Sequence, residues 1–285
     1  MGVLLCQPGE GVRRMLEKQP EKLDCPFEWP CMPCADAACM AVCCMKSREC
    51  LLMERKSGAP VCRMGCVPGV SALRFSGCGR YLYQLSSEAD CIHTCCAATG
   101  ELMYAAPVGV FPRSMSAGEG GKLLLCAGGA ANEAVLLHAP DLTHVRTIHT
   151  RHPCFAADFW QDGLLLVCAA EGEDIRTVIE TLPPRAVRAR RLTELPGPPG
   201  GLCICPDHTS ALVSTRAGLS KLDLQTGALL WNCPEWALCM RIECKGNEAL
   251  ISDTLDGTVW LFNHHRPWER RLLAQSADSQ ACFLC

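Results

Sequence analysis

Two Cys-x-x-Cys motifs lie near opposite ends of the sequence, Cys31-Met32-Pro33-Cys34 and Cys282-Phe283-Leu284-Cys285. A structural zinc ion takes four cysteine or histidine ligands in a tetrahedron, so the two motifs together supply enough thiols for one site. Iron–sulfur clusters are held by the same ligand type. The sequence therefore offers Cys31, Cys34, Cys282 and Cys285 as candidate metal ligands, provided that the fold brings both ends of the chain together.

The 24 cysteines of the chain also admit a simpler interpretation. A free cysteine behaves as a small apolar residue and packs well inside a core. Residues three apart on a regular strand point to opposite faces, which argues against a shared ligand shell within one motif. We therefore expect most cysteines to be buried free thiols and no bound cofactor, with zinc or an iron–sulfur cluster as the alternative. The interpretation rests on cysteines in apolar segments, such as Cys126, Cys168, Cys203, Cys205 and Cys239.

A repeat of about forty residues is the element that must position these side chains. Its clearest copy has apolar strands at 70–75, 81–83 and 91–94, a Thr-Gly turn, and a last strand at 101–104. Four short strands at this period are typical of one blade of a β-propeller. Six such units begin near Pro30, Val67, Val108, Arg151, Gly197 and Ala237.

An incomplete unit remains at each end of the sequence. Residues 1–26 supply outer strands and residues 279–285 supply one inner strand. Neither end can bury its faces alone, whereas pairing them completes a blade and removes two exposed sheet edges. The sequence predicts a single all-β domain over residues 1–285, a seven-bladed β-propeller of four-stranded antiparallel blades whose closing blade is formed jointly by both ends. A six-bladed ring is the alternative.

Motifs in two units support this architecture. The segment 256–263, Asp-Gly-Thr-Val-Trp-Leu-Phe-Asn, resembles the third strand of a WD-repeat. The segment 218–227 ends in Leu-Asp-Leu-Gln-Thr-Gly and is similar to YVTN and quinoprotein-like repeats. The chain thus resembles the broad WD-repeat/YVTN-like β-propeller superfamily, and the resemblance implies a rigid ring whose loops bind partners.

Composition narrows the partners and the compartment. The formal net charge of −3 gives no bulk attraction to nucleic acid or to an anionic membrane. No run of eighteen apolar residues is present, and the N-terminus lacks a basic region followed by an apolar stretch. We expect a cytoplasmic protein with a protein partner, without nucleic acid or membrane. Arginines are expected on the outer, fourth strands, where charge discourages edge pairing, at Arg13, Arg14, Arg146, Arg188, Arg190, Arg191, Arg270 and Arg271.

One main function and two alternatives fit such a ring. The first is a non-catalytic interaction platform that binds a protein or a small ligand through its loop face. The alternative is a hydrolase resembling the propeller lactonases, with a site in the central channel, or a propeller that binds a metal through cysteines. We expect the platform, without catalytic residues, because aspartates near strand ends also favour turns. The carboxylates available to a hydrolase are Asp158, Asp207, Asp253 and Asp256.

Overall fold

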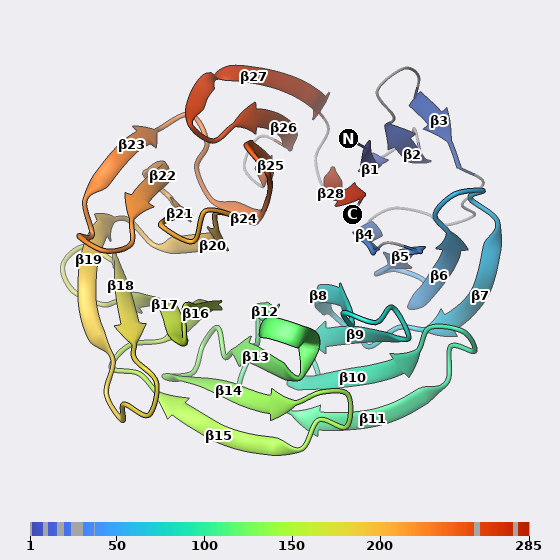
Figure 1. Cartoon of the computed structure of the whole chain (residues 1–285), viewed down its shortest axis with the longest axis horizontal. Helices are drawn as coiled ribbons and strands as arrows, with labels where there is room; N and C mark the ends of the chain where they lie inside the picture. Colours follow the sequence, from blue (N-terminus) through green and yellow to red (C-terminus); the bar gives the residue numbers. More distant parts are fainter. Residues whose placement is uncertain are drawn as a thin grey trace.

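The apolar runs of the sequence form short strands, and seven groups of four strands stand around a common axis in a computed structural model (Figure 1). The structure describes residues 2–7, 11–15, 20–23, 31–36, 38–253, 257–275 and 279–284. Within these residues, 28 strands form seven four-stranded antiparallel sheets. The prediction of a seven-bladed all-β propeller is confirmed, and the six-bladed alternative is wrong.

The strands of each blade are given in order from the innermost to the outermost. Blade 1 has β4 (Cys31–Ala35), β5 (Cys39–Cys44), β6 (Glu49–Glu54) and β7 (Pro60–Gly65); blade 2 has β8 (Val70–Phe75), β9 (Tyr81–Ser86), β10 (Cys91–Cys96) and β11 (Leu102–Pro107). Blade 3 has β12 (Ser114–Ala117), β13 (Leu123–Ala127), β14 (Glu133–His138) and β15 (His144–His149); blade 4 has β16 (Cys154–Trp160), β17 (Gly163–Ala170), β18 (Arg176–Leu182) and β19 (Arg190–Pro196).

The remaining blades follow the same order. Blade 5 has β20 (Pro199–Ile204), β21 (Ser210–Thr215), β22 (Gly218–Asp223) and β23 (Leu229–Cys233); blade 6 has β24 (Cys239–Lys245), β25 (Glu248–Asp253), β26 (Thr258–Asn263) and β27 (Arg266–Gln275). The closing blade has β28 (Gln280–Leu284), β1 (Gly2–Gln7), β2 (Gly11–Met15) and β3 (Pro20–Lys22). A 3-10 helix, Glu119–Gly121, joins β12 to β13. No helix among the described residues is long and apolar enough to cross a lipid bilayer.

The core lies between the blades. The second strand of each blade is covered on both faces by neighbouring sheets, which is why runs such as Leu164-Leu165-Leu166-Val167 need not alternate with polar residues. The described apolar side chains gather into seven clusters, each shared by two adjacent blades. Removing this apolar area from water contributes roughly 25 cal/mol per Å² to folding. Every blade therefore depends on both of its neighbours.

Segments from the two ends of the chain share the closing blade. β28 pairs antiparallel with β1, with Gly2 opposite Leu284 and Leu4 opposite Cys282. Its outer neighbour β2 carries Arg14, which is buried and donates from Nη1 to the backbone carbonyls of Arg55 and Lys56 in blade 1. The closing blade is thereby joined to blade 1 by polar contacts as well as by packing.

The arginines only partly follow the expected pattern. Arg146, Arg190, Arg191, Arg270 and Arg271 lie on fourth strands as expected. Arg188 precedes β19, and Arg13 and Arg14 lie on β2, the third strand of its blade. The expectation for Arg13 and Arg14 was wrong because the short strand β3 pairs with the outer edge of β2 and takes the fourth position of the blade.

Most of the described cysteines are packing residues. The 21 whose side chains the structure describes are free thiols, and Cys126, Cys168, Cys205 and Cys239 are buried in strands or at their ends. Cys203 is half-buried. The expectation of free thiols in the blade cores is confirmed for this part of the chain.

Candidate functional site

Two faces of the ring are built from different turns. The turn between the second and third strands hydrogen-bonds the loop that leads to the next inner strand, as in the bonds from Cys66 N–H to Arg48 O (2.8 Å) and from Val108 N–H to Asp90 O (3.0 Å). We call this side the entry face, because the chain enters each inner strand there. The remaining turns form the exit face, where Ala97 N–H donates to Arg80 O (2.9 Å).

The predicted metal ligands lie on adjacent inner strands. Cys34 is on β4 and Cys282 is on β28, but Cys34 packs into the core between blades 1 and 2, whereas Cys282 packs between the closing blade and blade 1. Burial raises the pKa of the Cys34 thiol to about 11 and also raises the pKa of Cys282. The Cys31 side chain and Cys285 lie outside the described residues, within which no group of three His, Cys, Asp or Glu side chains could hold a metal ion.

The four carboxylates proposed for a hydrolase do not form one group. Asp158 lies on the inner strand β16, where burial raises the pKa of its carboxyl although nearby Arg74 on β8 lowers it. Asp207 lies in a turn of the exit face and accepts hydrogen bonds from the backbone N–H groups of Thr209 (2.9 Å) and Ser210 (3.1 Å). This is the turn-forming role that aspartate commonly has. The Asp253 side chain and Asp256 lie outside the described residues.

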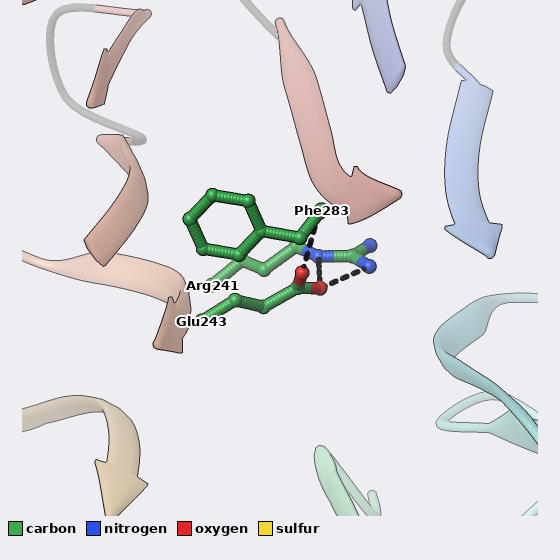
Figure 2. Close-up of polar contacts among 3 residues, drawn as sticks. All are labelled: Arg241, Glu243 and Phe283. Atoms are coloured by element: carbon green, nitrogen blue, oxygen red, sulfur yellow. Dashed lines mark hydrogen bonds and ion pairs between the residues drawn. The ribbon is translucent and has the colours of Figure 1, made fainter. Parts of the chain in front are cut away.

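An ion pair on β24 was missed by the sequence analysis (Figure 2). Arg241 donates from Nε (3.0 Å) and Nη2 (2.7 Å) to Oε1 of Glu243, and the other carboxylate oxygen, Oε2, accepts from the backbone N–H of Phe283 (2.8 Å). Burial lowers the pKa of Arg241, but Glu243 and the nearby thiols raise it by more, so that its pKa lies above the ordinary value. Both oxygens of Glu243 are engaged, and the carboxylate connects β24 of blade 6 to β28 of the closing blade.

The entry face carries an exposed aromatic group that the sequence analysis also missed. In the loop between β11 and β12, Val110 is 57% exposed and Phe111 is 41% exposed. The guanidinium of Arg113 lies 4.7 Å from the ring centroid of Phe111 and 6.0 Å from that of Phe155, which follows the first residue of β16. We call Phe111, Arg113 and Phe155 the entry-face stack. Among the side chains that the structure describes, no carboxylate pairs with Arg113.

The backbone holds the entry-face stack in a strained conformation. Phe111 has a φ of +54°, a region that few non-glycine residues adopt. Its N–H donates to Oδ1 of Asp90 (2.6 Å), and its carbonyl lies so close to Gly129 that a Cβ there would come within 2.1 Å of it. Strain of this kind costs roughly 1–3 kcal/mol and persists only where surrounding contacts determine the conformation. The ring of Phe111 is therefore held at the surface by a rigid loop.

A shallow hollow of about 470 Å³ lies on the same face, between blades 4 and 5. Ile175, which is 48% exposed, contributes an apolar surface to it, and Asp174 and Arg216 contribute charge. The β17–β18 loop, the β19–β20 loop and the β21–β22 turn bound it. The entry face thus combines exposed apolar groups with charges of both signs.

No known protein family matches the chain, and no curated protein sequence is significantly similar to it. Solved structures are similar in fold. Dihydro-heme d1 dehydrogenase NirN, in complex with DHE, has a TM-score of 0.63 at 17% identity over 95% of this chain, which spans only 58% of NirN. Kuenenia stuttgartiensis hydrazine synthase has a TM-score of 0.67 at 11% identity, covering 92% of this chain and 90% of that one.

The β-propeller domain of Myceliophteria thermophila Cps50 (Swd1) is also similar, with a TM-score of 0.56 at 16% identity over 74% of this chain and 72% of that domain. At these identities the likeness concerns the fold alone. At that level, the β-propeller fold that the resemblance implied is confirmed.

Proposed function

We propose that this protein is a non-catalytic interaction platform that binds a protein partner through its entry face, with the entry-face stack as the anchor. The observation that carries the proposal is the exposed Phe111 ring, held by a strained loop and covered on one side by Arg113. Aromatic and arginine side chains dominate the residues that contribute most of the binding energy at protein interfaces. A rigid anchor also loses little conformational entropy on binding.

The chemistry of the stack specifies the partner. The central carbon of the Arg113 guanidinium lies over two aromatic rings, and its N–H groups have no carboxylate partner among the described side chains. A guanidinium at the surface without a carboxylate partner is suited to bind one, while the neighbouring Val110 and Phe111 are suited to apolar groups. The partner segment expected here carries an acidic residue next to an apolar or aromatic one.

Quantitative affinity capture from a cell lysate tests this proposal. Phe111→Asn removes the ring and keeps a residue that tolerates positive φ, and Arg113→Ala removes the guanidinium. The matched control is Leu102→Ala on β11 of blade 2, which removes a side chain that is 52% exposed outside the entry face. A specific partner should be depleted about tenfold or more with both entry-face variants and retained with the control.

Equal capture by all variants would contradict the proposal, as would a loss that accompanies unfolding. Thermal denaturation of each variant separates the two cases. Phe111→Asn should be at least as stable as the parent protein, because asparagine relieves backbone strain at this position.

The hydrolase alternative retains one supporting observation. Burial raises the pKa of Asp158 on an inner strand, as expected for a carboxyl that acts as a general acid or base. Hydrolysis of lactones that is abolished by Asp158→Asn and kept by Asp207→Asn would favour this alternative over the platform.

A further inference from the structure

Three thiols meet at the entry-face end of blade 1. Cys43 is the last but one residue of β5 and Cys50 is the second residue of β6. The two residues are directly opposite each other in the strand register. Cys66 lies in the loop between β7 and β8, and its N–H donates to the carbonyl of Arg48 in the β5–β6 turn (2.8 Å). The backbone thus places Cys66 over the ends of the two strands that carry Cys43 and Cys50. We call these three residues the thiol cluster.

Exposure differs within the thiol cluster. Cys43 and Cys50 are completely buried in the core between blades 1 and 2. Cys66 packs against the same core but is half-buried and lies in a loop of the entry face. A small reagent from solvent therefore meets Cys66 first, and the two buried thiols lie beneath it.

The pKa values also separate Cys66 from the other two thiols of the cluster. Hydrogen bonds from the Cys43 and Cys50 thiols lower the pKa of Cys66 to about 5, whereas burial raises the pKa values of Cys43 and Cys50 well above their ordinary range. Cys66 is therefore the thiol of the cluster that ionises most readily. The thiolate is the nucleophilic form of cysteine.

We propose that the thiol cluster is an oxidative modification site, at which Cys66 reacts with a hydroperoxide and then forms a disulfide with Cys43 or Cys50. In the first step the Cys66 sulfur attacks one peroxide oxygen, an S–O bond forms, the O–O bond breaks, and hydroxide leaves when the oxidant is hydrogen peroxide. In the second step a buried thiol attacks the Cys66 sulfur, the S–S bond forms, and the S–O bond breaks.

The two steps balance. The departing hydroxide of the second step takes the proton of the attacking thiol and leaves as water. The hydroxide of the first step takes from solvent the proton that Cys66 released on ionising. The two sulfur atoms together lose two electrons, and one molecule of hydrogen peroxide becomes two molecules of water. Disulfide exchange with an external dithiol reverses the reaction.

Two other thiol groups lack this combination. Cys78 on the exit face is exposed, and hydrogen bonds from Ser76 and Arg80 lower its pKa to about 7. No second thiol contributes to this change in the pKa of Cys78. Cys154 and Cys168 are directly opposite each other on β16 and β17, but both are fully buried. Cys66 alone of these four thiols is both accessible and next to a thiol that can resolve a sulfenic acid.

A disulfide from Cys66 would tie the β7–β8 loop to β5 or β6. The inference goes beyond the proposed partner binding and does not depend on it, because the entry-face stack lies in the β11–β12 loop and on β16 of blade 4 and includes none of the three thiols.

The test treats the folded, full-length protein with a limited amount of hydrogen peroxide and then traps the remaining thiols in denaturant. Digestion and peptide mapping by mass spectrometry follow. A peptide that links Cys66 to Cys43 or Cys50, and that is lost after dithiothreitol, is the expected product. Cys78 should instead yield sulfenic or more highly oxidised forms. A map in which Cys66 stays unlinked while other cysteines oxidise would overturn the proposal.

The pH dependence of alkylation gives a second readout that needs no variant. Iodoacetamide should modify Cys66 with a midpoint near pH 5 and Cys78 with a midpoint near pH 7. A Cys66 midpoint at or above that of Cys78 would contradict the thiolate assignment. Cys66→Ser should abolish the disulfide, whereas Cys62→Ser, a matched half-buried cysteine on β7, should leave it unchanged.

Discussion

Glu243 makes two contacts that belong to different blades. Its carboxylate neutralises Arg241 on its own strand and accepts the Phe283 N–H of β28. Glu243→Ala would leave a largely buried guanidinium and a backbone N–H without these partners, and a lost buried partner of this kind costs about 1–3 kcal/mol. We expect a lower free energy of unfolding in urea by that amount.

A matched pair of variants separates the contacts of Glu243. Glu243→Gln keeps an acceptor for Phe283 N–H and should lose less stability than Glu243→Ala. Glu269→Ala removes a carboxylate from the exposed ion pair with Arg266 (3.1 Å), and exposed pairs contribute less than about 1 kcal/mol. Equal losses of unfolding free energy for Glu243→Ala and Glu269→Ala would show that Glu243 does not stabilise the contact between blade 6 and the closing blade.

His264 gives the protein a dependence on pH. It is buried, its Nε2 lies 2.9 Å from the Gly246 carbonyl, and its Nδ1 lies 3.0 Å from the Lys221 ammonium, so the ring is neutral with its proton on Nε2. Burial, and to a smaller extent Lys221, lowers the pKa of His264. A histidine with a lowered pKa contributes stability above its unfolded pKa of about 6.5 and loses it as the pH falls through the folded value.

The expected result is a decrease in the free energy of unfolding below pH 6.5. His264→Gln should make that decrease smaller, whereas His138→Gln, a change at an exposed position, should leave it as it is. An unchanged pH profile for His264→Gln would contradict this assignment.

The sequence could predict the positions of some of these residues but not of others. Arg241 and Glu243 are two positions apart on a predicted inner strand, so period-two alternation places them on one face. The partner of Glu243, Phe283, lies 40 residues away and follows only from the geometry of ring closure. The strained φ of Phe111 has no sequence signal, because glycine or asparagine is the usual residue for that conformation.

At the scale of elements, strand pattern and turn residues were sufficient to predict the blades. Apolar runs bounded by glycine, proline or aspartate became strands, and the short β5–β6 turn places Cys43 opposite Cys50. What the pattern does not contain is the contact between a loop and a strand, such as that of Cys66 with the β5–β6 turn. Such contacts depend on the stacking of neighbouring blades.

β28 is the element whose loss should matter most. It supplies the inner strand of the closing blade and packs Ala281 and Phe283 against blade 6 and Cys282 against blade 1. Deleting residues 279–285 should destabilise the whole ring, because the blades on either side lose buried contacts. Thermal denaturation by circular dichroism measures this.

The control for that deletion is Gln280→Ala, which changes a half-buried side chain and keeps the strand. A deletion variant with the same melting temperature as the parent protein would show that the ring does not depend on β28.

The metal content of the whole molecule is a further prediction. Cys34 and Cys282 pack into different inter-blade cores, and burial raises the pKa of both, whereas a metal ligand must be a convergent thiolate. We expect well below one zinc or iron ion per chain by elemental analysis after purification without chelators. Stoichiometric metal that is lost in Cys31→Ser/Cys34→Ser would instead establish the four-cysteine site.

The pairing of β1 with β28 also determines how the ring responds to mechanical force. Gly2 and Leu284 are opposite each other at one end of the two antiparallel strands. Tension applied between these two residues loads the hydrogen bonds of the pair one at a time, so the strands should separate like a zipper at low force. Tension between Gln7 and Leu284, at opposite ends of the pair, loads all of the bonds in shear. Optical-tweezers measurements with handles at these positions should give a clearly higher rupture force for the second geometry.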